Sequence, residues 1–518
     1  MRKYIFVIGI VNLLSGFVVN SVFAETGCLP LQHCVPETLY HPVFFKDGKY
    51  YDANGNDAVA KVPMRVQEYG WGAAFPTEPI VTNRWRKVDF ERAFLEVRED
   101  GLLFDRGQLD AIKSKLREFK GRPIYVSTYV HGWHHNADDK VINDANRYDS
   151  PVNAIKFNNF VARFADMTHR FFDLKGVIIP PVVIGIYVGW RGESMDGPLS
   201  MATLGSRASV ADDIGRNTSD GSLYWALGQI ADEMRDTHAD SRMLLFGHSL
   251  GGRMMSVMYL KEIVAGKDFP LGKGVLITAI EPAIGADCYD PVFSRKIKHT
   301  PRQLPSFIAM TSEDDAAVGK WYPISRLVPI VAPAACNPKS GATGKTIGNY
   351  DPYVTHLLKF NYFADLSSGK TPNPTPFEKD GKTFSAPLIE NNSEIILEPK
   401  DGHAFWRYKY FNNETGCIGN KCYDSDDAIF YRMDFVKKAA FESATTVWNV
   451  RTDNKLINMA KDSDERYGTH NGYVSTNLTN FLVQMTYLEK DWSAPVPPPR
   501  APSSGPPADA GTSTIPLK

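Results

Sequence analysis

Met243-Leu-Leu-Phe246 leads directly into Gly247-His248-Ser249-Leu250-Gly251-Gly252, and this passage predicts a buried strand, a sharp turn and a helix. The turn has the pattern Gly-x-Ser-x-Gly, in which the residues two places either side of the serine must be nearly free of side chain. Apolar residues then recur at helical spacing until Gly266, a helix stop signal: Met254, Met255, Met258, Leu260, Ile263 and Val264. Such a turn lifts a serine hydroxyl off the sheet, so Ser249 is a candidate nucleophile.

Further strands and helices alternate along the chain on both sides of this turn. Strands are predicted at residues 94–97, 124–130, 182–188, 275–280, 307–310 and 446–450. Helices are predicted after a cap at Asp105, and at residues 157–171, 223–234 and 478–485. Near-continuous apolar strands that alternate with amphipathic helices predict an α/β fold, with a mostly parallel, doubly wound sheet and helices on both of its faces.

The N-terminus has the pattern of a secretory signal peptide over residues 1–24. Arg2 and Lys3 precede an apolar run from Ile5 to about Val19, and Val22-Phe-Ala24 suits cleavage after a small residue. We therefore expect an exported protein, periplasmic or secreted, with no stable membrane insertion after cleavage. An uncleaved membrane anchor is the alternative, although the run is short for a membrane-spanning helix.

Composition divides the rest of the chain into five parts. Residues 25–93 are expected to form an N-terminal extension packed on the core, and residues 94–335 the first part of that core. Residues 336–440 lack the alternation and are predicted to be an insertion, either a lid or a surface module. Residues 441–490 contain the last strand, a histidine loop and the final helix. The proline-rich tail at 494–518 cannot form a core and is expected to be disordered.

Charge and cysteine content narrow the partners and the compartment. The 518 residues have a formal net charge of −1 at pH 7, so the chain lacks the excess of basic residues that would indicate a nucleic-acid partner. The six cysteines are expected to be bridged in an exported chain, and fifteen pairings are possible. Their grouping favours Cys28 with Cys34 and Cys417 with Cys422, which close short loops, and then Cys288 with Cys336.

A serine nucleophile needs a base, and the sequence offers two histidines for this role. His470 lies in a loop between the last predicted strand and the final helix, where a base is expected. His403 is the rival, within the irregular insertion and without a strand of its own. We expect His470 to be the base.

The acid that orients the base should lie just past a strand between the serine and the histidine. The strand at 307–310 runs into Thr311-Ser-Glu-Asp314-Asp315, and Asp315 is the first choice, with Asp314 second. Glu281, after the preceding strand, is third. Spacing alone does not distinguish which carboxylate reaches the imidazole.

Backbone N–H groups should stabilise the oxyanion, one from the residue after the serine and one from the loop after an earlier strand. Leu250 supplies the first. Trp133 supplies the second, since Gly132 before it allows a close backbone approach.

This set of residues resembles the α/β-hydrolase superfamily. More narrowly, Tyr129-Val-His-Gly-Trp-His-His-Asn136, Tyr187-Val-Gly-Trp-Arg-Gly192, Trp448-Asn-Val-Arg-Thr452 and Thr469-His-Asn-Gly472 resemble poorly characterised bacterial hydrolases of esterase/lipase type. The similarity covers roughly residues 94–320 and 440–490. It implies the α/β-hydrolase fold, a Ser-His-Asp triad, no cofactor and no metal, and small-molecule or lipid-like ester substrates. The long stretch between Asp315 and His470 departs from the family pattern.

Two other classes of function remain open. His131, His134 and His135 lie close together in the sequence and could bind zinc, which would generate a hydroxide nucleophile. Alternatively, the fold could serve as a non-catalytic binding module, which the proline-rich tail and the insertion would suit. Nothing in these patterns indicates an oligomeric state.

Overall fold

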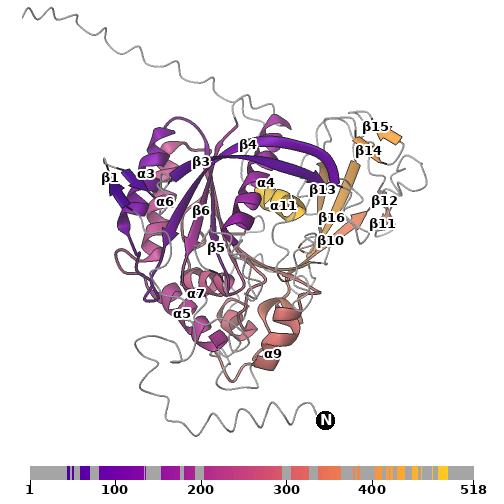
Figure 1. Cartoon of the computed structure of the whole chain (residues 1–518). Coiled ribbons are helices and arrows are strands. Elements are labelled where there is room, and N and C mark those ends of the chain that lie inside the picture. The colour runs from indigo at the N-terminus through magenta and orange to yellow at the C-terminus, as the bar shows by residue number, and fades with distance from the viewer. Residues whose placement is uncertain are drawn as a thin grey trace, which may run out of the picture.

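An eleven-stranded sheet runs through the protein in the order β3-β4-β6-β5-β7-β8-β9-β17-β10-β16-β13 (Figure 1). Its strands are β3 (Val59–Tyr69), β4 (Val81–Glu96), β5 (Ile124–Val130), β6 (Val182–Gly189), β7 (Arg242–His248), β8 (Val275–Ile280), β9 (Phe307–Ser312), β10 (His356–Tyr362), β13 (His403–Tyr410), β16 (Ile429–Lys437) and β17 (Val447–Thr452). The computed structural model describes residues 44–46, 49–51, 59–69, 81–133, 135, 153–174, 180–192, 203–293, 305–325, 336–362, 377–379, 382–384, 403–410, 416–418, 421–423, 429–437, 446–452, 457, 470 and 476–487.

The central part of this sheet is parallel. Every neighbouring pair from β4 across to β10 runs in the same direction, whereas β3, β16 and β13 pair antiparallel at the two edges. All residues of β5, β8 and β9 are buried, as expected of strands covered on both faces. The protein therefore belongs to the α/β class, as the sequence predicts.

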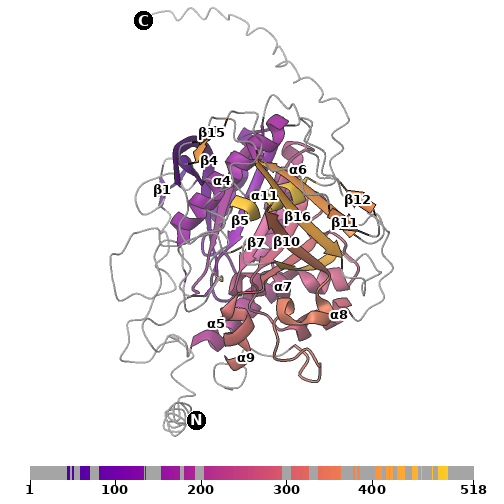
Figure 2. The ribbon, with the colours of Figure 1, turned by 90° about the vertical axis from the view of Figure 1, so that its right-hand side faces the viewer.

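Helices cover both faces of the sheet (Figure 1). On one face lie α3 (Arg106–Glu118), α5 (Leu204–Arg216), α6 (Leu223–Thr237) and α7 (Leu250–Val264), which share one apolar core with the sheet. On the other face α4 (Asn153–Leu174) and α11 (Thr476–Thr486) pack side by side in a second, more aromatic core (Figure 2). The sheet thus separates two hydrophobic cores.

The helices begin and end where the sequence signals lie. The Asp105 carboxylate accepts from Gly107 N at 2.8 Å and caps α3. Leu223, Leu227, Ile230 and Met234, which recur at helical spacing in α6, are all buried, and α7 ends two residues before Gly266, whose φ is 100°. These predicted helices, and the predicted strands from β5 to β9, are confirmed to within a few residues.

The strand order reverses between β5 and β7. From β5 the chain moves to β6 on one side, and after β6 it returns past β5 to form β7 on the other side. In open α/β sheets, the carboxyl ends of the two strands where the order reverses are the usual place for a ligand. Val130 pairs with Gly247 at this point, so the segments after β5 and β7 begin next to each other.

The sheet is wider than the sequence suggests. The stretch at 25–93, expected to be an N-terminal extension, contributes β3 and most of β4 to the central sheet. Three more of its strands, β10, β13 and β16, come from the range 336–440 that was expected to be an insertion. These strands mix aromatic and charged residues, as in His403-Ala-Phe-Trp-Arg-Tyr-Lys-Tyr410, and β3, β16 and β13 pair antiparallel at the edges. They lack the continuous apolar run that reveals a strand buried on both faces.

The remaining described elements are short. They are β1 (Phe44–Lys46), β2 (Lys49–Tyr51), η3 (Ala286–Tyr289), α8 (Asp290–Phe293), η4 (Ala317–Trp321), α9 (Tyr322–Ser325), η5 (Ile347–Asn349), η6 (Asp351–Tyr353), β11 (Phe377–Lys379), β12 (Lys382–Phe384), β14 (Gly416–Ile418) and β15 (Lys421–Tyr423). Among the helices that the structure describes, none combines the length and apolarity needed to cross a membrane. The predicted signal peptide and proline-rich tail lie outside the described residues.

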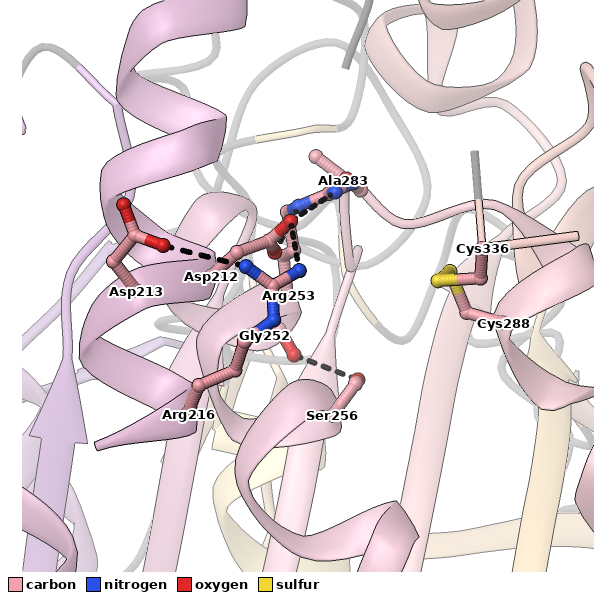
Figure 3. Close-up of polar contacts among 9 residues, drawn as sticks. All are labelled: Asp212, Asp213, Arg216, Gly252, Arg253, Ser256, Ala283, Cys288 and Cys336. Carbon is pink, nitrogen blue, oxygen red and sulfur yellow. Dashed lines mark hydrogen bonds and ion pairs between the residues drawn. A yellow bond between two sulfur atoms is a disulfide. The ribbon is translucent and has the colours of Figure 1, made fainter. Parts of the chain in front are cut away.

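A disulfide joins Cys288 and Cys336. Cys288 and Cys336 are bonded at 2.07 Å, which joins the turn after β8 to the segment before β10 (Figure 3). Cys417 and Cys422 are backbone partners across the β14–β15 hairpin, as the expected local pair requires. Cys28 and Cys34 lie outside the described part of the chain. A disulfide is compatible with the expected export of the protein.

Candidate active site

Ser249 occupies a strained turn between β7 and α7. Its φ of 55° and ψ of −115° lie in a region that residues with a side chain rarely adopt. The glycines beside it are required by close contact, since a Cβ on Gly251 would lie 2.2 Å from Val130 O and one on Gly247 2.4 Å from Gly251 O. The predicted strand, turn and helix are therefore all present, with the serine at the bend.

Backbone hydrogen bonds tie this turn to the loop after β8. Ser249 N donates to Ile280 O at 3.0 Å, and Ala283 N donates to Ser249 O at 3.1 Å. Beneath the loop, Arg253 Nη1 donates to Ala283 O at 3.3 Å. The Arg253 guanidinium also makes two 2.7 Å bonds to the Asp212 carboxylate (Figure 3), and both side chains are almost fully buried. Backbone hydrogen bonds and a buried ion pair therefore hold the strained turn in place.

The structure brings His470 and Asp315 together. His470 Nδ1–H donates to Asp315 Oδ2 at 2.7 Å, and Asp315 Oδ1 accepts from Ala317 N at 2.8 Å and Val318 N at 3.1 Å. Burial raises the pKa of Asp315, but attraction to His470 and these hydrogen bonds outweigh it, so the pKa lies below its usual value. Asp314, the second choice of the sequence analysis, is exposed.

His248 places this pair beside the turn. Its Nε2–H donates to the His470 carbonyl oxygen at 2.7 Å, and the two rings lie 4.7 Å apart between centroids. Because His248 immediately precedes Ser249, the serine and histidine segments are held next to each other. The sequence analysis assigned no role to His248, and its position inside the Gly-x-Ser-x-Gly pattern was the signal that could have revealed one.

The buried side chain of His131 stabilises the loop after β5 through two hydrogen bonds. Its Nε2 accepts from Trp190 N at 3.1 Å, so the proton resides on Nδ1, which donates to Gly132 O at 2.9 Å. The ring is fully buried and stacks on Trp190. Burial, only partly offset by these hydrogen bonds, lowers the pKa of His131 to about 4, which keeps it neutral.

The Gly132 carbonyl is therefore turned towards the His131 ring. In a trans peptide the following N–H, that of Trp133, points the opposite way. A Cβ on Gly132 would lie 2.9 Å from the Ser249 Cβ, so this loop runs against the serine. On the serine side, Leu250 is the first residue of α7, where backbone N–H groups have no partner within the helix. Both expected oxyanion donors thus belong to segments that meet at Ser249.

A zinc site built on His131 does not agree with this arrangement, since both of its ring nitrogens are engaged in hydrogen bonds. His134 lies outside the described residues. Within the described part of the chain, the one group of acidic, cysteine and histidine side chains close enough to share a metal is Asp287 with Cys288 and Cys336. The two cysteines of that group are joined in the disulfide and are not available as thiolates.

The two remaining candidates lie in very different places. His403 begins β13, at the far edge of the sheet, with five strands between β13 and β7. Glu281 follows β8 and is completely buried, and its Oε1 accepts from Ser312 N at 2.9 Å, which places its carboxyl group next to that of Asp315. The sequence analysis placed Glu281 near the site but did not anticipate contact between the two carboxyl groups.

Comparisons with protein-family models, with curated proteins and with solved structures returned no match for this chain. Its function must therefore be argued from the site itself.

Proposed function

We propose that this protein is an exported serine hydrolase of the α/β-hydrolase type, which cleaves carboxylic esters of small-molecule or lipid-like substrates. The observation that carries the proposal is the left-handed Ser249 on a strand–turn–helix, beside a buried His470–Asp315 pair. A strained nucleophile on such a turn, followed along the chain by an acid and then a histidine, is the arrangement expected of this type of enzyme.

The proposed reaction uses the chain's own groups. His470, oriented by Asp315 through Nδ1, takes the Ser249 proton on Nε2 while Oγ attacks the ester carbonyl carbon. The N–H groups of Trp133 and Leu250 stabilise the resulting oxyanion. The intermediate collapses to an acyl-serine as the alcohol leaves with the proton from His470. Water then attacks the acyl group with His470 again as the base, which releases the acid and the free serine.

Fluorophosphonate labelling and a series of p-nitrophenyl esters of increasing acyl length test this proposal. We expect a covalent adduct on Ser249, ester turnover that is insensitive to chelators, and a loss of at least about 10⁴-fold in kcat for Ser249→Ala. A folded protein that forms no adduct and hydrolyses no ester would overturn the proposal. Activity that survives Ser249→Ala but is lost to a chelator would favour a metal-dependent hydrolase instead.

A further inference from the structure

Glu281 is the second residue, besides Ser249, to combine a side chain with a positive φ among the described residues. Its φ is 47°, and its side chain is completely buried. Glu281 N donates to Met310 O of β9 at 2.8 Å, and the residue before it accepts from Ser249 N. The two strained residues therefore follow neighbouring strands and are linked by the backbone. A left-handed, buried glutamate costs stability, so its side chain is expected to contribute to the site.

The Glu281 side chain reaches the acid of the proposed triad. Its Oε1 accepts from Ser312 N at 2.9 Å, in the same turn in which Asp315 N donates to Ser312 O at 3.3 Å. Its Oε2 is buried and has no hydrogen-bond donor among the described residues, with the Asp315 carboxyl group as its charged neighbour. Two carboxylates cannot make a hydrogen bond, because both only accept. Two ionised carboxylates would also repel each other at this buried position, so we expect one of the two groups to carry a proton in the folded protein.

The hydrogen-bond donors around the pair decide which group carries it. Asp315 receives His470 Nδ1–H and two backbone N–H groups, and these three donors favour an ionised carboxylate. Glu281 receives one backbone N–H, and burial followed by repulsion from Asp315 raises its pKa well above the usual value. Among the described residues Asp315 is the ionisable group facing Glu281, with His470 on the far side of Asp315.

We infer that Glu281 is a positioning residue, whose carboxyl O–H donates to the Asp315 carboxylate and fixes the side chain that orients His470. The hydrogen bonds then converge on Asp315, which accepts from both Glu281 and His470. The catalytic part of this inference rests on the proposed ester hydrolysis, whereas the protonation of Glu281 does not.

Glu281→Gln and Glu281→Leu form a matched pair that tests the inference. Gln presents an N–H donor to Asp315 and an oxygen to Ser312 N, so we expect kcat within about threefold of the unmodified protein with an unchanged pH profile. Leu has a similar size but no donor, and kcat should fall about 10–100-fold at nearly constant KM, the range typical of losing an outer hydrogen-bond partner. Equal losses in both variants would overturn the inference.

A second measurement needs no activity and remains informative if Glu281→Leu does not fold. In the unfolded chain Glu281 ionises above about pH 4.3, whereas in the folded chain it keeps its proton. Unfolding then releases a proton, so this group lowers stability as pH rises above 4.3. Denaturation midpoints of Glu281→Gln should therefore rise relative to the unmodified protein between pH 4.5 and 7.5. A difference that stays constant with pH would overturn the assigned proton, whether or not Ser249 proves to be a nucleophile.

Discussion

Asp315→Asn changes one atom of the proposed triad, and the structure specifies what the change does. Oδ1 of residue 315 accepts two backbone N–H groups, from Ala317 and Val318, and these can only donate. The Asn side-chain oxygen must therefore remain on that side, which turns its NH₂ group towards His470 Nδ1. The imidazole then has to accept at Nδ1 and carry its proton on Nε2, the wrong tautomer for a base.

The expected loss in kcat for Asp315→Asn is about 10⁴-fold, or about 5 kcal/mol of transition-state stabilisation. Hydrolysis of p-nitrophenyl acetate over a range of concentrations separates kcat from KM, and KM should change little because the residue does not face the substrate. Asp314→Asn is the matched control, since it makes the same chemical change at the exposed neighbouring position. Asp315→Asn activity within tenfold of the control would refute the assignment of Asp315 and the tautomer argument with it.

Three further predictions concern stability and are measured by denaturant unfolding. Gly251→Ala should cost about 1–3 kcal/mol, because its Cβ would meet Val130 O at 2.2 Å, whereas Gly228→Ala, in open space on α6, should be neutral or stabilising by up to about 1 kcal/mol. Asp212→Ala should cost about 3–5 kcal/mol because it leaves the Arg253 cation buried without its carboxylate, and Asp212→Ala combined with Arg253→Met should cost less than the single change. His131 has a pKa of about 4 in the folded protein, whereas in the unfolded chain it becomes charged below about pH 6.5. The free energy of unfolding should therefore fall by about 3 kcal/mol as pH decreases from 6.5 to 4, and His131→Asn should reduce this pH dependence.

The sequence predicts the central strands well because burial on both faces leaves a simple mark. β5 and β8 begin and end at the predicted residues. The helix α5 was not predicted, and the reason is physical: Arg207 and Asp212 are buried on it and make ion pairs, so charged residues stand where an apolar face would be sought. The edge strands were missed for a related reason. A strand that is not covered on both faces does not need a continuous apolar sequence, so the pattern that reveals the central strands is absent.

The candidate site was predictable as a set of residue types but not as a set of contacts. Asp314 and Asp315 are adjacent in one turn, and only the fold shows that residue 315 points inward to His470. Likewise, Glu281 could be placed near the site because it follows β8, but its contact with Asp315 depends on the spacing of two neighbouring strand ends. Contacts of this kind arise from tertiary structure and leave no local pattern.

The position of β17 has a consequence for the synthesis of the protein. β9 and β10 follow each other in the central sheet's chain order, yet β17 lies between them and pairs with both. A ribosome therefore releases β9 and β10 well before the strand that must fill the gap, and their facing edges stay unpaired until then. His470 comes from the same late part of the chain, so Asp315 has no imidazole partner during most of translation. A nascent or truncated chain that stops before Val447 therefore has an open sheet and lacks the histidine of the candidate site.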